Sequence, residues 1–168
     1  CFSIDDFYLS KAQRIILGKE VHPLLFTRGV PGTHDVSLGI QKLIELRSTD
    51  KKSQTLIPVF SKALDDRLPE NEWVRFSGKP DVILFEGWCV GANSIHPNEL
   101  EHPINELERK YDKKAVYRNF VNNQLGSVYK EWFSLINYQV FMEIPSFEKV
   151  REWRWLQEQK LIAFLKDQ

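Results

Sequence analysis

The sequence predicts an α/β fold built from parallel βαβ units, and three observations support this prediction. Short runs typical of strands occur at residues 1–4, 55–60, 82–85 and 137–144. Segments with helical periodicity or helix caps lie between these runs, and such alternation favours a parallel sheet. Residues 82–85 are four large apolar side chains in succession, as in a parallel strand buried on both faces.

The composition indicates one globular domain. The 168 residues are 42% hydrophobic and 27% charged, enough for a substantial core. The 23 basic and 23 acidic side chains give a formal net charge of zero, so we expect no polybasic surface and no nucleic-acid partner. No apolar run approaches the roughly 20 residues of a membrane span, so no membrane partner is expected.

The two cysteines and the first residues indicate the cellular compartment and the extent of the polypeptide. The two cysteines, Cys1 and Cys89, make no disulfide framework, which favours a reduced, cytoplasmic setting. We recognise no secretory signal. The chain begins without methionine and enters a strand at once. We therefore expect residues 1–168 to be a single domain of a longer polypeptide, truncated before Cys1 and after Gln168.

In the first third of the chain, two helices follow the first strand. The strand at residues 1–4 ends in Asp5-Asp6, and Ser10 is a suitable cap for a helix to about residue 17. Residues 24–35 form a loop rich in glycine and proline. Asp35 then caps a second amphipathic helix, whose apolar positions are Leu38, Leu43, Ile44 and Leu46.

The remaining chain is expected to alternate between strands and helices. A charged loop at residues 61–69 follows the strand at 55–60, and a Gly/Asn/Pro-rich excursion at 91–98 follows the strand that ends at Glu86. Amphipathic helices are expected at about residues 99–111 and 115–132. After the strand at 137–144, Ser146 begins a helix that continues to residue 167, with Phe147, Val150, Trp153, Leu156, Leu161 and Phe164 on its apolar side.

Carboxylates at the ends of two strands are the first candidate site. Asp5 and Asp6 follow the first strand, and Glu86 follows the run at 82–85. If these strands are neighbours in a parallel sheet, Asp5 and Glu86 meet at its carboxyl edge, where ligands of open α/β folds bind. One carboxylate can then accept a proton while the other holds a divalent cation. Alternatively, these residues only form turns or cap an element.

The loop from Arg28 to Asp35 is the second candidate. Gly29, Pro31 and Gly32 restrict its backbone shape, and Arg28 and His34 flank them. Ordering such a loop costs conformational entropy, which favours a function over an ordinary connection. The charged residues Lys62, Asp65, Asp66 and Arg67 taken alone indicate a solvated face instead.

Arg151 and Arg154 lie one turn apart on the last predicted helix and so share a face. They are suited to clamp a transferring phosphoryl group, or they are ordinary exposed charges of an amphipathic helix. No Gly-x-x-x-x-Gly-Lys-[Ser/Thr] phosphate loop occurs, because Gly78-Lys79 is followed by Pro80 and precedes a strand. The histidines and cysteines have no spacing expected for zinc.

Four stretches in order give a resemblance to a known family. They are Ser3-Ile4-Asp5-Asp6-Phe7-Tyr8-Leu9, the loop ending Arg28-Gly29-Val30-Pro31-Gly32-Thr33-His34-Asp35, Phe85-Glu86-Gly87-Trp88, and Trp153-Arg154-x-x-Gln157-Glu158. Together they resemble plant-type D-glycerate 3-kinase and its fungal and bacterial ATP-binding relatives. These proteins lie within the phosphoribulokinase, uridine kinase and pantothenate kinase group of P-loop kinases. The Arg28–Asp35 stretch is the most specific of the four.

The resemblance implies a three-layer P-loop NTPase-type fold with a mainly parallel sheet, incomplete at the N-terminus because the Walker A loop would precede Cys1. It implies ATP and Mg²⁺ as cofactors and a small-molecule acceptor as the other partner. Asp5 would be the general base and, with Glu86, a magnesium ligand. Arg154 and Arg151 would reach the phosphates. The implied substrate-binding residues are Asp6, Tyr8, Arg28, His34, Asp35, Lys62 and Arg67.

The sequence departs from the family pattern beside the acceptor site. The family's Pro-x-Tyr-Asp-Lys-Ser stretch is Pro58-Val59-Phe60-Ser61-Lys62-Ala63 here, and Asp65 replaces a glycine. The resemblance thus implies a kinase that phosphorylates an alcohol of D-glycerate or a similar hydroxy acid, with the isolated segment inactive. A kinase of the same group acting on a nucleoside or pantothenate, and a nucleotide-binding protein without turnover, remain alternatives.

Overall fold

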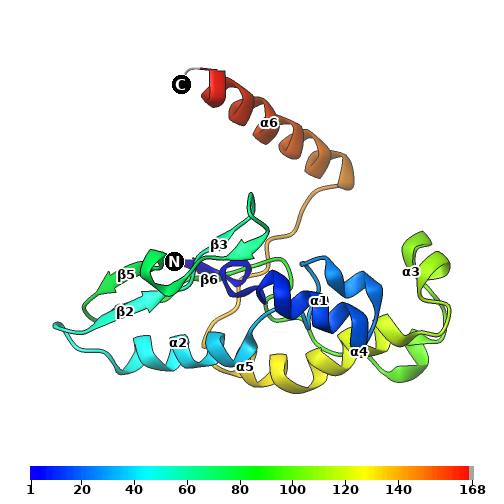
Figure 1. The fold of residues 1–168 in the computed structure, drawn as a ribbon, viewed down its shortest axis with the longest axis horizontal. Coiled ribbons are helices and arrows are strands. Elements are labelled where there is room, and N and C mark those ends of the chain that lie inside the picture. Colours follow the sequence, from blue (N-terminus) through cyan, green and yellow to red (C-terminus); the bar gives the residue numbers. More distant parts are fainter. Residues whose placement is uncertain (167–168) are drawn as a thin grey trace. The chain divides into compact units, whose positions relative to one another are not determined.

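The computed structural model describes residues 1–166, in two units at residues 1–137 and from residue 138 onward. The first unit begins with strand β1 (Phe2–Ser3), which pairs in parallel with β6 (Phe85–Glu86) (Figure 1). The register places Phe2 opposite Phe85 and Ser3 opposite Glu86. The parallel pairing expected between the first strand and the strand that ends at Glu86 is therefore observed.

Strand β6 is shorter and less buried than the apolar run at residues 82–85 predicts. Val82 is 73% exposed and Leu84 61% exposed, so the prediction of a strand buried on both faces is wrong for these residues. Among the described residues β6 pairs only with β1, which itself has two residues. A strand with a single short neighbour has neither the hydrogen bonds nor the covering layers that would bury the whole run.

The two helices predicted in the first third are present. Helix α1 (Lys11–Glu20) begins with a capping box between Ser10 and Gln13, and it is followed by the 3₁₀ turn η2 (Pro23–Phe26). Helix α2 (Val36–Ser48) begins at the predicted cap, where Asp35 Oδ1 accepts a hydrogen bond from the Leu38 amide at 3.2 Å. Local capping chemistry was thus sufficient to locate both helix starts.

The strand predicted at residues 55–60 is divided in two by Pro58, which has no amide hydrogen to donate. Strand β2 (Gln54–Ile57) pairs antiparallel with β5 (Val74–Ser77). Strand β3 (Phe60–Ser61) forms a hairpin with β4 (Asp66–Arg67), and the 3₁₀ turn η3 (Glu70–Glu72) follows. The prediction of a plain charged loop at 61–69 missed this hairpin, because strand β4 begins with Asp66 and aspartate is a poor strand former.

The helices after β6 differ from their predicted bounds. The helix expected at 99–111 is interrupted near Pro103, leaving the 3₁₀ turn η4 (Pro97–Leu100) and α3 (Glu106–Tyr111). The helix expected at 115–132 is present as one helical path of α4 (Val116–Gln124), the π-helical segment η5 (Leu125–Tyr129) and α5 (Lys130–Ser134). The π-helical segment, which ends at Tyr129, was not predicted.

The strand expected at residues 137–144 is not observed, because no described residue supplies the partner that a strand needs. In the second unit the helix predicted after Ser146 is observed as α6 (Phe147–Lys166); the last residue of the predicted range, Asp167, lies outside the described residues. None of the helices described within residues 1–166 is long and apolar enough to cross a membrane.

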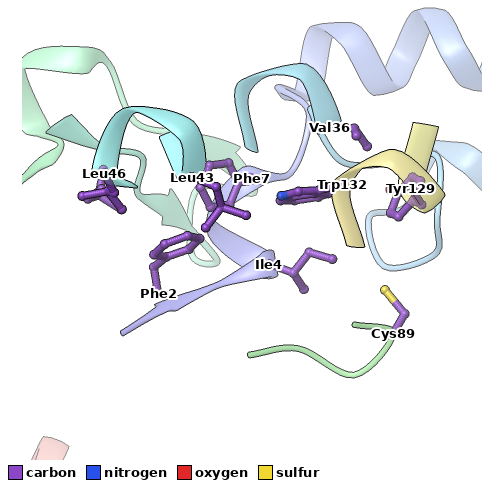
Figure 2. Close-up of a cluster of buried hydrophobic side chains, with 10 residues drawn as sticks. Phe2, Ile4, Phe7, Val36, Leu43, Leu46, Cys89, Tyr129 and Trp132 are labelled. Atoms are coloured by element: carbon purple, nitrogen blue, oxygen red, sulfur yellow. The ribbon is translucent and has the colours of Figure 1, made fainter. Parts of the chain in front are cut away.

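Trp132 of α5 lies at the centre of the core of the first unit (Figure 2). Its ring contacts Phe7 at 5.6 Å and Phe85 at 5.0 Å between centroids, which joins α5 to β6 and to the turn after β1. A Cβ added at Gly39 of α2 would lie 2.1 Å from the Trp132 ring, so only glycine permits this approach of α2. The core thereby fixes β1, β6 and α2, the elements that flank the predicted site.

Candidate active site

Asp5 lies in the 3₁₀ turn η1 (Ile4–Phe7), which directly follows β1 and is capped by Ser3. Its Oδ2 is 2.9 Å from Lys62 Nζ, and the Tyr8 side chain lies nearby. Burial alone would raise the pKa of Asp5, but the interactions with Lys62 and Tyr8 outweigh it and lower the pKa. Asp5 is therefore an ionised, partly exposed carboxylate at neutral pH, able to accept a proton or to bind a cation.

Asp6, its neighbour, has a different environment. Its Oδ1 accepts a hydrogen bond from the Phe60 amide at 3.4 Å, which ties η1 to strand β3. Burial raises the pKa of Asp6, the opposite direction to Asp5. The two adjacent carboxylates thus differ in role, with Asp6 holding the β3–β4 hairpin against the turn that carries Asp5.

The β3–β4 hairpin carries three charged side chains that pair with other elements, so the interpretation of Lys62, Asp65, Asp66 and Arg67 as a solvated face is incomplete: Lys62 is exposed, whereas Asp65 and Arg67 are partly buried. Lys62 pairs with Asp5, and Arg67 Nη1 lies 2.9 Å from Asp35 Oδ2. Asp35 therefore caps α2 with one oxygen and binds the hairpin with the other. Asp65, between them in sequence, pairs with Arg14 and Arg28.

Arg28 is held by Asp65 rather than standing free. Arg14 shares the same carboxylate at 3.1 Å, and both guanidinium groups lie over the Phe60 ring, at 5.3 Å for Arg28 and 5.8 Å for Arg14. Burial opposes the charge of Asp65, but its bonds to the two arginines outweigh burial and lower its pKa. Asp65 has a φ of 54°, a left-handed conformation that glycine adopts readily and aspartate tolerates. This conformation is compatible with the glycine that the resemblance implies at this position.

His34 is buried between two tyrosines. Its ring stacks on Tyr8 at 4.4 Å with an interplanar angle of 19°, and its Nδ1 lies 2.6 Å from the Tyr129 hydroxyl. The same hydroxyl oxygen accepts a hydrogen bond from the Gly32 amide at 2.8 Å. Burial lowers the pKa of His34 to about 4, so the imidazole is neutral at physiological pH.

Glu86 and its neighbours form the other edge of the site. Glu86 is exposed and faces Ser3 across the parallel pair, two residues before Asp5. Gly87 is required by packing, since a Cβ there would lie 2.2 Å from Ile4 Cγ2. Trp88 Nε1 donates a hydrogen bond to the Gly29 carbonyl at 3.0 Å, which links the end of β6 to the Arg28–Asp35 loop. No group of three His, Cys, Asp or Glu side chains arranged for a metal is found within residues 1–166.

The structure thus gathers eight of the predicted site residues in the first unit around η1 and the hairpin: Asp5, Asp6, Tyr8, Arg28, His34, Asp35, Lys62 and Arg67. Sequence analysis missed Tyr129 and the pairing of Asp65. A buried tyrosine on a helix gave no local signal, whereas the replacement of the family's glycine by Asp65 was visible.

The two predicted phosphate-binding arginines lie on α6, in the second unit. Arg154 Nη1 donates to Gln157 Oε1 at 2.9 Å and pairs with Glu158, and Arg151 lies over the Phe147 ring at 5.4 Å. Two cavities of about 400 Å³ occur elsewhere in the first unit, one beside His22, Asp112 and Val116 and one beside Ser94, Asn122 and Ser127. Asp5 lines neither of them, so we assign neither cavity to the chemistry described above.

Comparison with known proteins supports a kinase. The chain is 29% identical over 169 residues to the uncharacterized kinase mug58 of Schizosaccharomyces pombe, which covers 96% of this chain and 60% of that protein. It is 29% identical over 159 residues to chloroplastic D-glycerate 3-kinase of Arabidopsis thaliana, covering 90% of this chain and 32% of the relative. A probable ATP-dependent kinase, TDA10 of Saccharomyces cerevisiae, is 30% identical over 177 residues, covering 96% and 56%. No family model matches the chain.

A solved structure is also similar to this chain. A D-glycerate 3-kinase from Cryptococcus neoformans superposes with a TM-score of 0.80 at 29% identity, over 98% of this chain and 60% of that one. These matches confirm the α/β fold class of a P-loop-type kinase. They also confirm the resemblance to D-glycerate 3-kinase and ATP-dependent kinases. The chain spans 60% or less of the length of these relatives.

Proposed function

We propose that this protein is an ATP-dependent kinase that phosphorylates an alcohol group of D-glycerate or a similar small hydroxy acid in the cytoplasm. The observation that supports it most is the ionised Asp5, paired with Lys62 beside Tyr8 at the end of β1, in a chain similar to D-glycerate 3-kinase. A carboxylate in that state can accept the proton of an attacking hydroxyl.

In the proposed reaction, Asp5 takes the proton of the acceptor hydroxyl while that oxygen bonds to the γ-phosphorus of ATP. The bond from the γ-phosphorus to the β–γ bridging oxygen breaks, and ADP leaves with the electron pair. Lys62 lies beside Asp5 and is 66% exposed, so it is free to place its charge near the transferring group. Positioning and charge neutralisation would supply most of the acceleration.

Mg²⁺ fits the donor set at this edge of the β1–β6 pair. Asp5 and Glu86 offer carboxylate oxygens, and Mg²⁺ commonly takes only one or two protein carboxylates and keeps several waters. They would hold the ion, which would neutralise charge on the phosphates. Glu86→Gln should therefore raise the magnesium concentration needed for half-maximal turnover and leave the acceptor KM unchanged.

The acceptor is assigned to the side of the site formed by the Arg28–Asp35 loop and the hairpin. Arg28, His34, Lys62 and Arg67 gather cationic and hydrogen-bonding groups there, beside Asp5. Asp6, Tyr8 and Asp35 hold these elements together and would border the acceptor. Arg28, Lys62 and Arg67 are each paired with a carboxylate, so the carboxylate of an anionic hydroxy acid would bind by replacing one of these partners, which a neutral nucleoside could not do.

Arg151 and Arg154 would meet the phosphates from α6, on which the two residues lie one helical turn apart. An arginine that contacts the phosphoryl group only during transfer affects kcat more than ATP affinity. Arg154→Ala should therefore lower kcat while the Kd for ATP changes only a few-fold. Unchanged turnover in this variant would remove α6 from the proposed site.

An acceptor panel tests the function in the whole natural protein. Glycerate, pantothenate, uridine and ribulose 5-phosphate are offered with magnesium-ATP, and ADP release is measured for the wild type and for Asp5→Asn. We expect glycerate to give the highest kcat/KM, with Asp5→Asn nearly inactive. Preference for uridine or pantothenate would select the alternative kinase, and ATP binding without turnover on any acceptor would select a nucleotide-binding protein.

A further inference from the structure

Tyr129 has no part in the motifs that resemble the kinases, yet it lies at the centre of a buried hydrogen-bond network. It is the last residue of the π-helical segment η5 and is completely buried. Its hydroxyl contacts both the Gly32 amide, at 2.8 Å, and His34 Nδ1, at 2.6 Å. Single π-helical turns are often retained at functional sites, where the extra residue redirects a side chain.

The donors and acceptors of this network assign the proton on His34. The Gly32 amide can only donate, so the Tyr129 oxygen is its acceptor. The Tyr129 proton then needs an acceptor of its own, because a buried hydroxyl without one is costly. His34 Nδ1 is the group in reach, which favours a proton on Nε2, although Nε2 is itself buried with no hydrogen-bond partner among the described residues. Burial raises the pKa of Tyr129, which keeps the phenol protonated and able to donate.

The His34 ring in turn fixes Tyr8. The two rings stack at 4.4 Å, and their backbones form an antiparallel bridge. Flanking hydrogen bonds, from Leu9 N to the Thr33 carbonyl at 2.9 Å and from Asp35 N to the Phe7 carbonyl at 2.7 Å, hold the two segments in register. The Tyr8 side chain lies near the Asp5 carboxylate and lowers its pKa. Tyr129, His34 and Tyr8 thus form a series of neighbours that leads to the proposed base.

We propose that Tyr129 is a positioning residue for Asp5: it fixes the orientation and tautomer of His34, against which Tyr8 stacks beside Asp5. This role rests on the proposed function, since Asp5 is the base only if the protein is a kinase. The network also fixes Gly32, whose φ of 100° lies in the left-handed region, and with it the shape of the Arg28–Asp35 loop.

The first test observes the tautomer directly and needs no activity. Long-range ¹H–¹⁵N correlation spectra of the whole natural protein near neutral pH distinguish the two ring nitrogens of His34. We expect a protonated Nε2 and an unprotonated Nδ1 in the wild type, and a mixture of tautomers in Tyr129→Phe. Tyr117→Phe is the matched control, because it lies in the same helical path and its hydroxyl makes no hydrogen bond with the described residues. A proton on Nδ1 in the wild type would overturn the inference.

The second test is a double-mutant cycle on kcat with Tyr129→Phe and Tyr8→Phe. Because a small displacement of a catalytic group is costly, Tyr129→Phe should lower kcat roughly tenfold or more, with the KM for ATP unchanged. If Tyr129 acts through Tyr8, the double variant should be no slower than Tyr8→Phe alone. Independent, multiplicative effects would mean that Tyr129 has a structural role only and would overturn the inference.

His34→Asn provides a second route if Tyr129→Phe does not fold. An asparagine oxygen can replace Nδ1 as the acceptor for Tyr129 but removes the ring that stacks on Tyr8, so kcat should fall as in Tyr8→Phe. Retention of wild-type kcat by His34→Asn would overturn the inference. A wild-type protein without turnover on any acceptor would overturn the proposed function, and the role of Tyr129 with it, whereas normal turnover with a multiplicative cycle overturns the role alone.

Discussion

Two carboxylate–cation pairs in the first unit have the same chemistry and opposite surroundings. Asp112 is 1% exposed and accepts hydrogen bonds from the amides of Tyr117 and Arg118, at 2.9 and 3.0 Å, and from Arg118 Nη1 at 3.2 Å. Arg118 also donates to the carbonyls of Leu100 and Glu101. This pair holds η4 and α3 to the start of α4 with every partner supplied by the protein.

The Asp5–Lys62 pair is open by comparison. Asp5 is 27% exposed and Lys62 66% exposed, and neither is enclosed by backbone groups. A pair whose partners face solvent contributes little to stability, but it can exchange its partner for a substrate or an ion. The contrast separates a carboxylate that fastens helices together from one that is available for chemistry, and substitutions in both pairs test it.

The largest effect is expected at Asp5. Asp5→Asn keeps the size of the side chain but removes the proton acceptor, so kcat should fall roughly 10²- to 10⁴-fold. The Kd for ATP and the melting temperature should change little, because the pair with Lys62 is exposed. Steady-state kinetics, nucleotide titration and thermal unfolding of the whole protein measure the three quantities. Near-normal turnover would place the base elsewhere, with Asp6 the next candidate.

The same substitution in the closed pair, Asp112–Arg118, should affect stability alone. Asp112→Asn leaves the buried Arg118 guanidinium without its counter-charge, which should lower the free energy of unfolding by about 3–5 kcal/mol. The kcat of the folded protein should be unchanged. Glu106→Gln is the matched control, because its pair with Arg109 is exposed on both sides and should leave the melting temperature unaltered. Equal melting temperatures of Asp112→Asn and Glu106→Gln would contradict the distinction between closed and open pairs.

His34 should make the fold sensitive to acid. Its pKa is about 4 in the folded protein and about 6.5 in the unfolded chain, so between these values the unfolded state binds a proton that the folded state does not. The free energy of unfolding is therefore unaffected by His34 above pH ~6.5. It falls by about 3 kcal/mol in total as the pH decreases from ~6.5 toward about 4. Urea unfolding from pH 7.5 to pH 4.5 measures the slope, which should be smaller in His34→Gln. His102→Asn, an exposed control, should keep the wild-type slope.

Sequence analysis found the parts of the molecule that local chemistry specifies. Ser10 and Asp35 marked helix starts because their side chains satisfy free amides, and Asp5 and Arg28 were visible because they adjoin a strand end and a constrained loop. The docking of the β3–β4 hairpin, the partner of Arg28 and the hydrogen bonds of Tyr129 involve contacts between residues 32–97 positions apart. Such contacts leave no periodic pattern, so they became visible only in the folded chain.

The smallest effect is expected at Arg28. Substitutions of Arg28 and Asp65 test whether the pairing of these two residues limits acceptor binding. An arginine can bind the carboxylate of a hydroxy acid with two parallel hydrogen bonds, but Asp65 already accepts from this guanidinium. Arg28→Lys should raise the KM for glycerate about tenfold, since one charge-assisted hydrogen bond contributes about 1.5 kcal/mol, and leave the KM for ATP unchanged.

Asp65→Gly should act in the opposite direction. Glycine suits the φ of 54° at this position, and the substitution frees Arg28 for the acceptor, so the KM for glycerate should fall. Arg14 keeps its hydrogen bonds to the carbonyls of Leu9 and Phe26, so the fold should survive the loss of its carboxylate partner. Glycerate KM values for both variants, with ATP KM as the internal control, settle the question. If both variants keep the wild-type glycerate KM, Arg28 belongs to the packing of the hairpin on α1, and the acceptor carboxylate must be bound by Lys62 or Arg67.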